Sequence, residues 1–115
     1  MIDFACRQFN LDDIIKCSLG LTKTEFKIMD YFLENKFPKI TTLLISKKLD
    51  LNLTTVQKAV KKLYEKKIIL RHQKNLEGGG YIYTYESNSR QDIRKIIRKI
   101  IEEWFNKVNK KINNW

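Results

Sequence analysis

The chain has 115 residues, which suits one compact domain and leaves little room for a second independent core. Its hydrophobic fraction of 43% is too high for a disordered chain, and 23 Lys and Arg against 13 Asp and Glu give a net charge of +10. A domain this basic suits a polyanionic partner, of which DNA is the commonest, although abundant lysine also fits a plain solvated surface.

Several classes of protein are disfavoured at once. The first ten residues carry no apolar signal core, and no run approaches the roughly 20 apolar residues of a membrane span, so we expect a cytoplasmic protein. Cys6 and Cys17 match no zinc spacing, which predicts two reduced, partly buried thiols and no metal. We expect no enzyme activity and no cofactor, because no nucleophile–base pair or phosphate loop is visible.

Two helices are predicted in the N-terminal third of the chain. The first covers residues 11–18 within an N-terminal helical extension, residues 1–20. Thr22 and Glu25 have the spacing of a capping box, so a second helix begins there and runs to about residue 35. Its apolar residues recur at helical spacing: Phe26, Ile28, Met29, Phe32, Leu33 and Phe37.

Two further helices are predicted after Pro38, which prevents the second helix from continuing. A third helix begins near Thr42, and Asn52 is a good N-cap for a fourth helix over residues 53–66. The apolar side of that helix is formed by Val56, Ala59, Val60 and Leu63. Its other side is polar and basic, with Thr54, Gln57, Lys58, Lys61 and Lys62.

The pattern then changes from helical to alternating. Residues 68–74 and 81–85 predict two strands, and the glycine-rich loop between them predicts a β-hairpin. The loop lacks the spacing of a nucleotide phosphate loop, so we interpret the hairpin as a wing. Three tyrosines share one face of the second strand, as packed residues or as stacking platforms for single-stranded nucleic acid: Tyr81, Tyr83 and Tyr85.

A long helix is predicted over residues 88–115. Its apolar residues approximate a coiled-coil seam, which predicts a homodimer through Ile97, Ile101, Trp104, Phe105, Val108 and Ile112. The basic residues of the same helix lie near flanking phosphates or are simply solvated. A basic amphipathic helix also suits a membrane surface, but a dimer is the more economical interpretation.

Two helices joined by a tight turn and followed by a hairpin predict a winged helix-turn-helix, which is a mainly α, α+β fold. The DNA-binding domain would cover residues 21–87, followed by a C-terminal dimerisation helix over residues 88–115. The segment 44–69 resembles the helix-turn-helix of MarR-superfamily regulators and, more closely, of archaeal TrmB-like regulators. The residues that carry the resemblance are Ser46, Asn52, Thr54, Thr55, Val56, Leu63 and Glu65.

The chain departs from this family pattern at two positions. Asp50 and Lys67 stand where family members often have glycine. A non-glycine residue adopts the required backbone with some strain, so we expect strain at both turns. The resemblance identifies neither an operator nor a small-molecule effector.

A double-stranded DNA site follows from this arrangement. We expect the helix over residues 53–66 to enter the major groove, with Thr54, Gln57, Lys58 and Lys61 facing the bases. Gln57 has the geometry to pair with adenine and Lys58 with guanine. Thr55 and Lys62 are expected to contact phosphates. The wing, residues 71–80, would contact the backbone or the minor groove through Arg71, His72, Lys74 and Asn75.

Other interpretations fit the same pattern. The polar face of the helix over residues 53–66 could be an ordinary solvated face. A nonspecific chromatin-type protein, or a basal-machinery winged-helix module, would use the +10 charge without preferring one sequence. Such a protein binds any duplex with similar affinity, whereas a regulator prefers one site.

Overall fold

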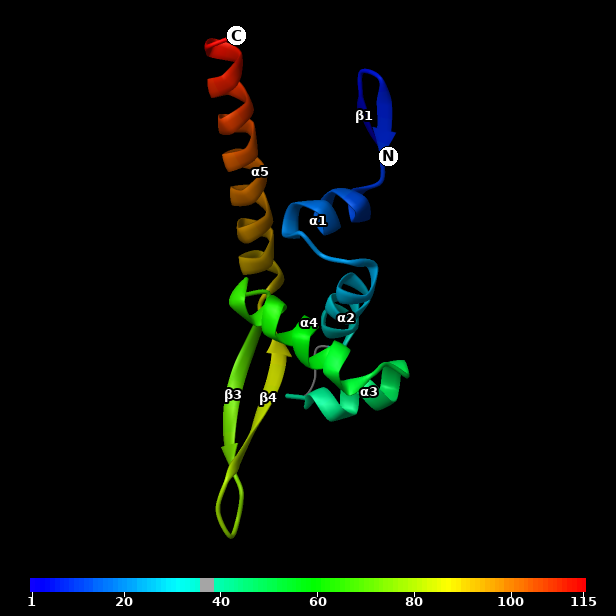
Figure 1. Cartoon of the computed structure of the whole chain (residues 1–115), viewed down its shortest axis with the longest axis vertical. Helices are drawn as coiled ribbons and strands as arrows, with labels where there is room; N and C mark the ends of the chain where they lie inside the picture. Colours follow the sequence, from blue (N-terminus) through cyan, green and yellow to red (C-terminus); the bar gives the residue numbers. More distant parts are fainter. Residues whose placement is uncertain (36–38) are drawn as a thin grey trace.

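The computed structural model describes residues 1–35 and 39–115, and it confirms the predicted winged-helix α+β fold (Figure 1). Helices dominate, and a β-hairpin follows the fourth of them. In chain order the elements are β1 (Ile2–Phe4), β2 (Arg7–Phe9), α1 (Leu11–Leu19), α2 (Lys23–Glu34), α3 (Thr42–Leu49), α4 (Leu53–Glu65), β3 (Ile69–Asn75), β4 (Tyr81–Ser87) and α5 (Arg90–Asn113).

The first two helices have the predicted ends. Gly20 closes α1 in the left-handed conformation with a φ of 65°, which glycine adopts at no steric cost. The capping box of α2 is present, because the Thr22 hydroxyl accepts from the Glu25 N–H and the Glu25 carboxylate accepts from the Thr22 N–H. The predictions for Phe37 and Pro38 lie outside the described residues.

The helix-turn-helix is formed by α3 and α4. Asn52 caps α4 as predicted, with its side chain accepting from the Thr54 N–H at 2.8 Å. Ser46 donates from α3 to the Leu51 carbonyl at 2.6 Å, which closes the turn. The expected strain is present, because Asp50 has a φ of 52° and Lys67 a φ of 64°.

One hydrophobic core joins these helices to the sheet. The apolar sides of α2, α3 and α4 meet at Phe32, Ile45 and Val56, each of which is almost completely buried. The predicted apolar side of α4 is confirmed, since Ala59, Val60 and Leu63 belong to the same core. This packing fixes α4 by one side and leaves its other side at the surface.

The hairpin pairs β3 with β4 in an antiparallel register that runs from Ile69 opposite Ser87 to Asn75 opposite Tyr81. Ile40 forms a short bridge to the other edge of β4, opposite Tyr85. The far end of the hairpin extends well beyond the helices (Figure 1). The hairpin therefore has the position of a wing beside α4.

The first ten residues differ from the helical extension that the sequence predicts. They form a small hairpin of β1 and β2, whereas the helix begins at Leu11, as predicted. Strands of three residues are too short for their alternation to identify a strand, so the sequence pattern does not reveal them. Cys6 and Cys17 are both exposed, which corrects the expectation of partly buried thiols.

The last helix, α5, projects away from the core (Figure 1). Its first turns pack against the core through Ile93, Ile96 and Ile97. Every residue from 101 to 115 is exposed. None of the helices within residues 1–35 and 39–115 combines the length and apolar content that crossing a bilayer requires.

Candidate nucleic-acid interface

The outer side of α4 is a polar and basic surface. Thr54, Gln57, Lys58 and Lys61 are all exposed, as the sequence predicts for the side opposite the core. They lie there because the buried residues of α4 recur every three or four positions, which turns the intervening residues outward. The structure therefore brings these four predicted residues together on one helix surface.

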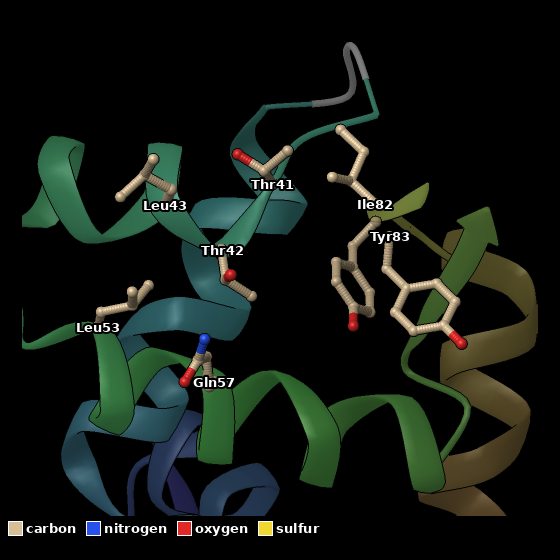
Figure 2. A pocket seen from close by; sticks show the side chains of 8 residues that line it. Thr41, Thr42, Leu43, Leu53, Gln57, Ile82 and Tyr83 are labelled. Carbon is tan, nitrogen blue, oxygen red and sulfur yellow. The ribbon is translucent and has the colours of Figure 1, made fainter. Parts of the chain in front are cut away.

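A hollow of about 510 Å³ lies between α4, the start of α3 and the wing. It is lined by Thr41, Thr42, Leu43, Leu53, Gln57, Ile82, Tyr83 and Tyr85. Figure 2 shows the Gln57 amide rising from α4 toward Thr42, with Tyr83 across the hollow. Gln57 is therefore a predicted DNA-contact residue that also lines the hollow between α4 and the wing. We refer to this feature as the α4–wing hollow.

A stack of three side chains joins α4 to the base of the wing. The Arg71 guanidinium lies 4.3 Å from the ring centroid of Tyr64 and 4.2 Å from that of Tyr83. Both distances are within the range of a cation–π interaction. Tyr85 lies directly opposite Arg71 in the sheet. Burial raises the pKa of the Tyr85 hydroxyl, with Arg71 opposing the shift, so this tyrosine stays neutral at ordinary pH.

The predicted wing residues divide between two faces of the hairpin. Strand alternation places Arg71 and Asn75 on one face of β3 and His72 and Lys74 on the other. Arg71 contacts Tyr64, so its face is the one that turns toward α4. His72 Nε2 lies 2.6 Å from the Glu86 carboxylate across the strands. The wing residues on the α4 side are therefore Arg71 and Asn75, with Gln73 between them.

Lys62 has two partners within the chain. Its ammonium group donates to the Gly20 carbonyl at 2.5 Å and to the Glu25 carboxylate at 2.9 Å. These contacts hold Lys62 on the flank of α4 that faces α2, so its charge is already satisfied within the chain. The periodicity of α4 identified Lys62 as polar but could not show that Glu25 lies beside it. The predicted phosphate contact of Lys62 would compete with these two partners.

Sequence reasoning missed two contributors to this surface. Leu53 and Ile82 both line the α4–wing hollow and are exposed, although they are apolar. The register pairs Ile82 with Lys74, on the face of the hairpin opposite Tyr83, and its position beside Thr41 depends on the tertiary packing of α3 against the wing (Figure 2). The sequence signal that Leu53 belongs to this surface was its place directly after the Asn52 cap, at the exposed start of α4.

These features define a winged-helix protein with a regulator-like fold. The family model of the DnaD N-terminal domain matches residues 9–112, so the chain belongs to the DnaD N-terminal domain family. It is 32% identical over 105 residues to the uncharacterized protein MJ1503 of Methanocaldococcus jannaschii, covering 91% of this chain and 78% of that protein.

Solved structures share the fold. A possible transcriptional regulator from Methanosarcina mazei Go1 is 46% identical and has a TM-score of 0.93, covering 100% of this chain and 96% of that chain. A mutant of MepR from Staphylococcus aureus, bound to an oligodeoxyribonucleotide, is 17% identical with a TM-score of 0.58. That alignment covers 87% of this chain and 72% of MepR and shows the fold alone.

Proposed function

We propose that this chain is a homodimeric transcriptional regulator that binds double-stranded DNA at a preferred sequence. The proposal includes the finer resemblance of α3 and α4 to archaeal TrmB-like regulators. It also includes the division into an N-terminal extension, residues 1–20, a DNA-binding domain, residues 21–87, and a dimerisation helix, residues 88–115. A regulator of this kind acts through binding and needs no catalytic group.

The observation that carries the proposal is the exposed polar and basic side of α4 beside the wing. A helix that is anchored by one side and free on the other fits the major groove, where its N-terminal residues reach base edges. The net charge of +10 favours approach to a duplex. Structural similarity to the Methanosarcina mazei protein, named as a possible transcriptional regulator, supports the same role.

Each exposed side chain of α4 has a distinct part in the proposal. Gln57 hydrogen-bonds the N6 and N7 edge of adenine, and Lys58 is placed for guanine. Thr54 and Lys61 border the same surface, and Thr55 contacts phosphate. On the wing, Arg71 and Asn75 face the duplex from the α4 side. The other two predicted wing residues, His72 and Lys74, contact the DNA backbone from the outer face of the hairpin.

The dimer part of the proposal rests on the exposed half of α5. Trp104 is 63% exposed and Phe105 is 51% exposed, which is unusual for large aromatic residues on a helix. Ile101, Val108 and Ile112 continue the apolar stripe, whereas Ile97 packs against the chain's own core. A second copy would cover the stripe because the same seam spacing is present on both helices.

Fluorescence anisotropy tests the function directly. A labelled duplex from the region upstream of the chain's own coding sequence is compared with a scrambled duplex across a salt series. We expect a preference of roughly 10³-fold and an affinity that falls steeply with salt. Gln57→Ala should reduce the specific affinity by roughly 1–3 kcal/mol. Gln91→Ala, at an exposed position on α5, is the matched control.

A second candidate is favoured by the charge alone. The +10 charge would also support a nonspecific chromatin-type or basal-machinery protein. That protein would bind both duplexes equally and with the same salt dependence. If a pool of random duplexes also yields no preferred sequence, the nonspecific candidate replaces the regulator. Absence of binding to every duplex at low salt would remove both candidates.

A further inference from the structure

The α4–wing hollow has an unexpected chemistry for a surface beside a basic helix. Leu43 is 51% exposed, Leu53 is 37% exposed and Ile82 is 36% exposed, and all three line it. Among the described residues, no charged side chain lines the hollow, although Lys58 lies one position after Gln57 on α4. A protein with a net charge of +10 thus places aliphatic side chains where it would meet a duplex.

The aliphatic part of the lining, beside the hydroxyl and amide groups of Thr41, Thr42 and Gln57, limits what it can contact on DNA. Phosphate oxygens and the polar edges of bases would lose hydration against leucine and isoleucine without gaining a hydrogen bond. In the major groove, the apolar group that a standard base pair displays is the C5-methyl of thymine. Leucine and isoleucine side chains would bury that methyl favourably.

Leu53 and Gln57 lie on the same side of α4. The two residues are four apart on α4, so their side chains are neighbours on one side of the helix. Leu53 is also the first residue of α4, at the helix end that approaches the bases most closely in a helix-turn-helix. An A·T pair displays the adenine N6 and N7 edge and the thymine methyl together in the major groove.

We propose that Leu53, with Leu43, forms a thymine-methyl contact surface beside Gln57. This inference rests on the proposed function and specifies it further. Gln57 reads adenine by hydrogen bonding, and the aliphatic side chains read the methyl of the same or the adjacent pair. The preferred site therefore contains an A·T pair at this position of each half-site.

Removal of single methyl groups from DNA tests the proposal. Duplexes selected from a random pool by the wild-type protein are resynthesised with each thymine replaced in turn by deoxyuridine, which lacks only the C5-methyl. At one or two positions per half-site, we expect the dissociation constant to rise about fourfold, the effect of losing one buried methyl group. At the other positions it should not change.

Two variants test whether the effect of deoxyuridine arises from Leu53 in the α4–wing hollow. Leu53→Ala should reduce the difference between thymine and deoxyuridine to about onefold at the sensitive position. Leu11→Ala is a close control, because Leu11 is an exposed leucine that also follows an asparagine N-cap, at the start of α1. It should retain the full fourfold difference. Circular dichroism and thermal melting verify that both variants fold.

The outcomes separate this inference from the function on which it rests. If selection yields no preferred duplex, the proposed regulator fails and the methyl contact fails with it. If a preferred duplex exists but deoxyuridine has no effect at any position, the regulator stands and the methyl contact is wrong. The hollow would then be open to a small uncharged ligand. A fourfold effect that persists in Leu53→Ala would also overturn the assignment.

Discussion

The Lys62 ammonium group lies 2.9 Å from the Glu25 carboxylate and so ties α4 to the first turn of α2. The same ammonium group also donates to the Gly20 carbonyl, in the turn between α1 and α2. The Glu25 side chain is only 16% exposed, so the ion pair is screened less than an ordinary surface pair. One lysine thereby ties the proposed recognition helix both to α2 and to the turn that follows α1.

Loss of this lysine should lower the stability of the fold. Lys62→Met keeps the aliphatic stem but removes both hydrogen bonds and leaves Glu25 without its cation. We expect the free energy of unfolding to fall by about 1–2 kcal/mol, because hydrogen bonds to charged groups are stronger than neutral ones. Urea denaturation measures this change. Lys61→Met, on the exposed side of the same helix, is the control and should leave stability within about 0.5 kcal/mol.

The Glu25 carboxylate should also make stability depend on pH. Burial alone would raise its pKa, but hydrogen bonds from Thr22 and Lys62 outweigh burial and lower the pKa below the usual 4.5. A lowered pKa in the folded state contributes stability above pH 4.5, and that contribution is lost as the pH falls through the folded-state value.

Glu25→Gln is the variant that isolates this effect. The wild-type protein should be more stable than Glu25→Gln near neutral pH, and the difference should shrink as the pH falls below 4.5. Urea denaturation at a series of pH values gives the difference directly. Asp30→Asn, at an exposed position of α2, is the comparison variant. A constant difference across the acid range would contradict the assignment.

The strain at Lys67 should be relieved by glycine. Lys67 has a φ of 64°, a conformation that costs a side chain roughly 1–2 kcal/mol and that glycine adopts freely. Because glycine also loses more entropy on folding, we expect Lys67→Gly to gain about 0.5–1 kcal/mol of stability. The neighbouring Lys66 has a φ of −84°, so Lys66→Gly should destabilise the protein. Equal effects at both positions would argue against strain at Lys67.

The Tyr64–Arg71–Tyr83 stack should couple the wing to α4. Arg71→Lys keeps the charge but loses the planar group that stacks between the rings. We expect it to lower stability by about 1 kcal/mol, with two cation–π contacts weakened, and to weaken DNA binding with little change in salt dependence. Arg7→Lys is the control, because the Arg7 guanidinium lies over the Phe9 ring at 5.2 Å, within the first hairpin. Full retention of stability in Arg71→Lys would contradict the coupling.

Local signals in the sequence were sufficient for most of the fold. The capping box at Thr22, the Asn52 cap and the period of α4 each depend on residues within one or two helical turns. The left-handed turns at Asp50 and Lys67 followed from the family pattern, in which glycine is common at both positions. These features were predictable because backbone geometry near a helix end is set by a few neighbouring residues.

The candidate site was less predictable, because it depends on contacts between distant segments. Lys62 and Glu25 are 37 positions apart, and no periodicity indicates that they meet. The same holds for Tyr64 and Arg71, which belong to different elements, and for Leu43 and Ile82, which line one hollow. Helical periodicity gives the side of a helix on which a residue lies, but tertiary packing determines which residue faces it.

The exposed half of α5 should form the contact between two copies of the chain. At 1.5 Å per residue, the 24 residues of α5 extend about 36 Å, and residues 101–115 are exposed throughout. An unsupported helix end of this length is only marginally stable in water, so the apolar stripe should be covered by a second copy. Trp104→Glu would place a charge in that stripe and should convert the dimer into a monomer.

Analytical ultracentrifugation at micromolar concentration checks this result. Asn106→Glu makes the same addition of charge on the opposite side of α5 and should leave the dimer intact. Because a dimer places two recognition helices about one DNA turn, roughly 34 Å, apart, Trp104→Glu should also remove the preference for a two-half-site duplex over a single half-site. If the wild-type protein is strictly monomeric at this concentration, the stripe needs a different partner, and the operator should then consist of a single site.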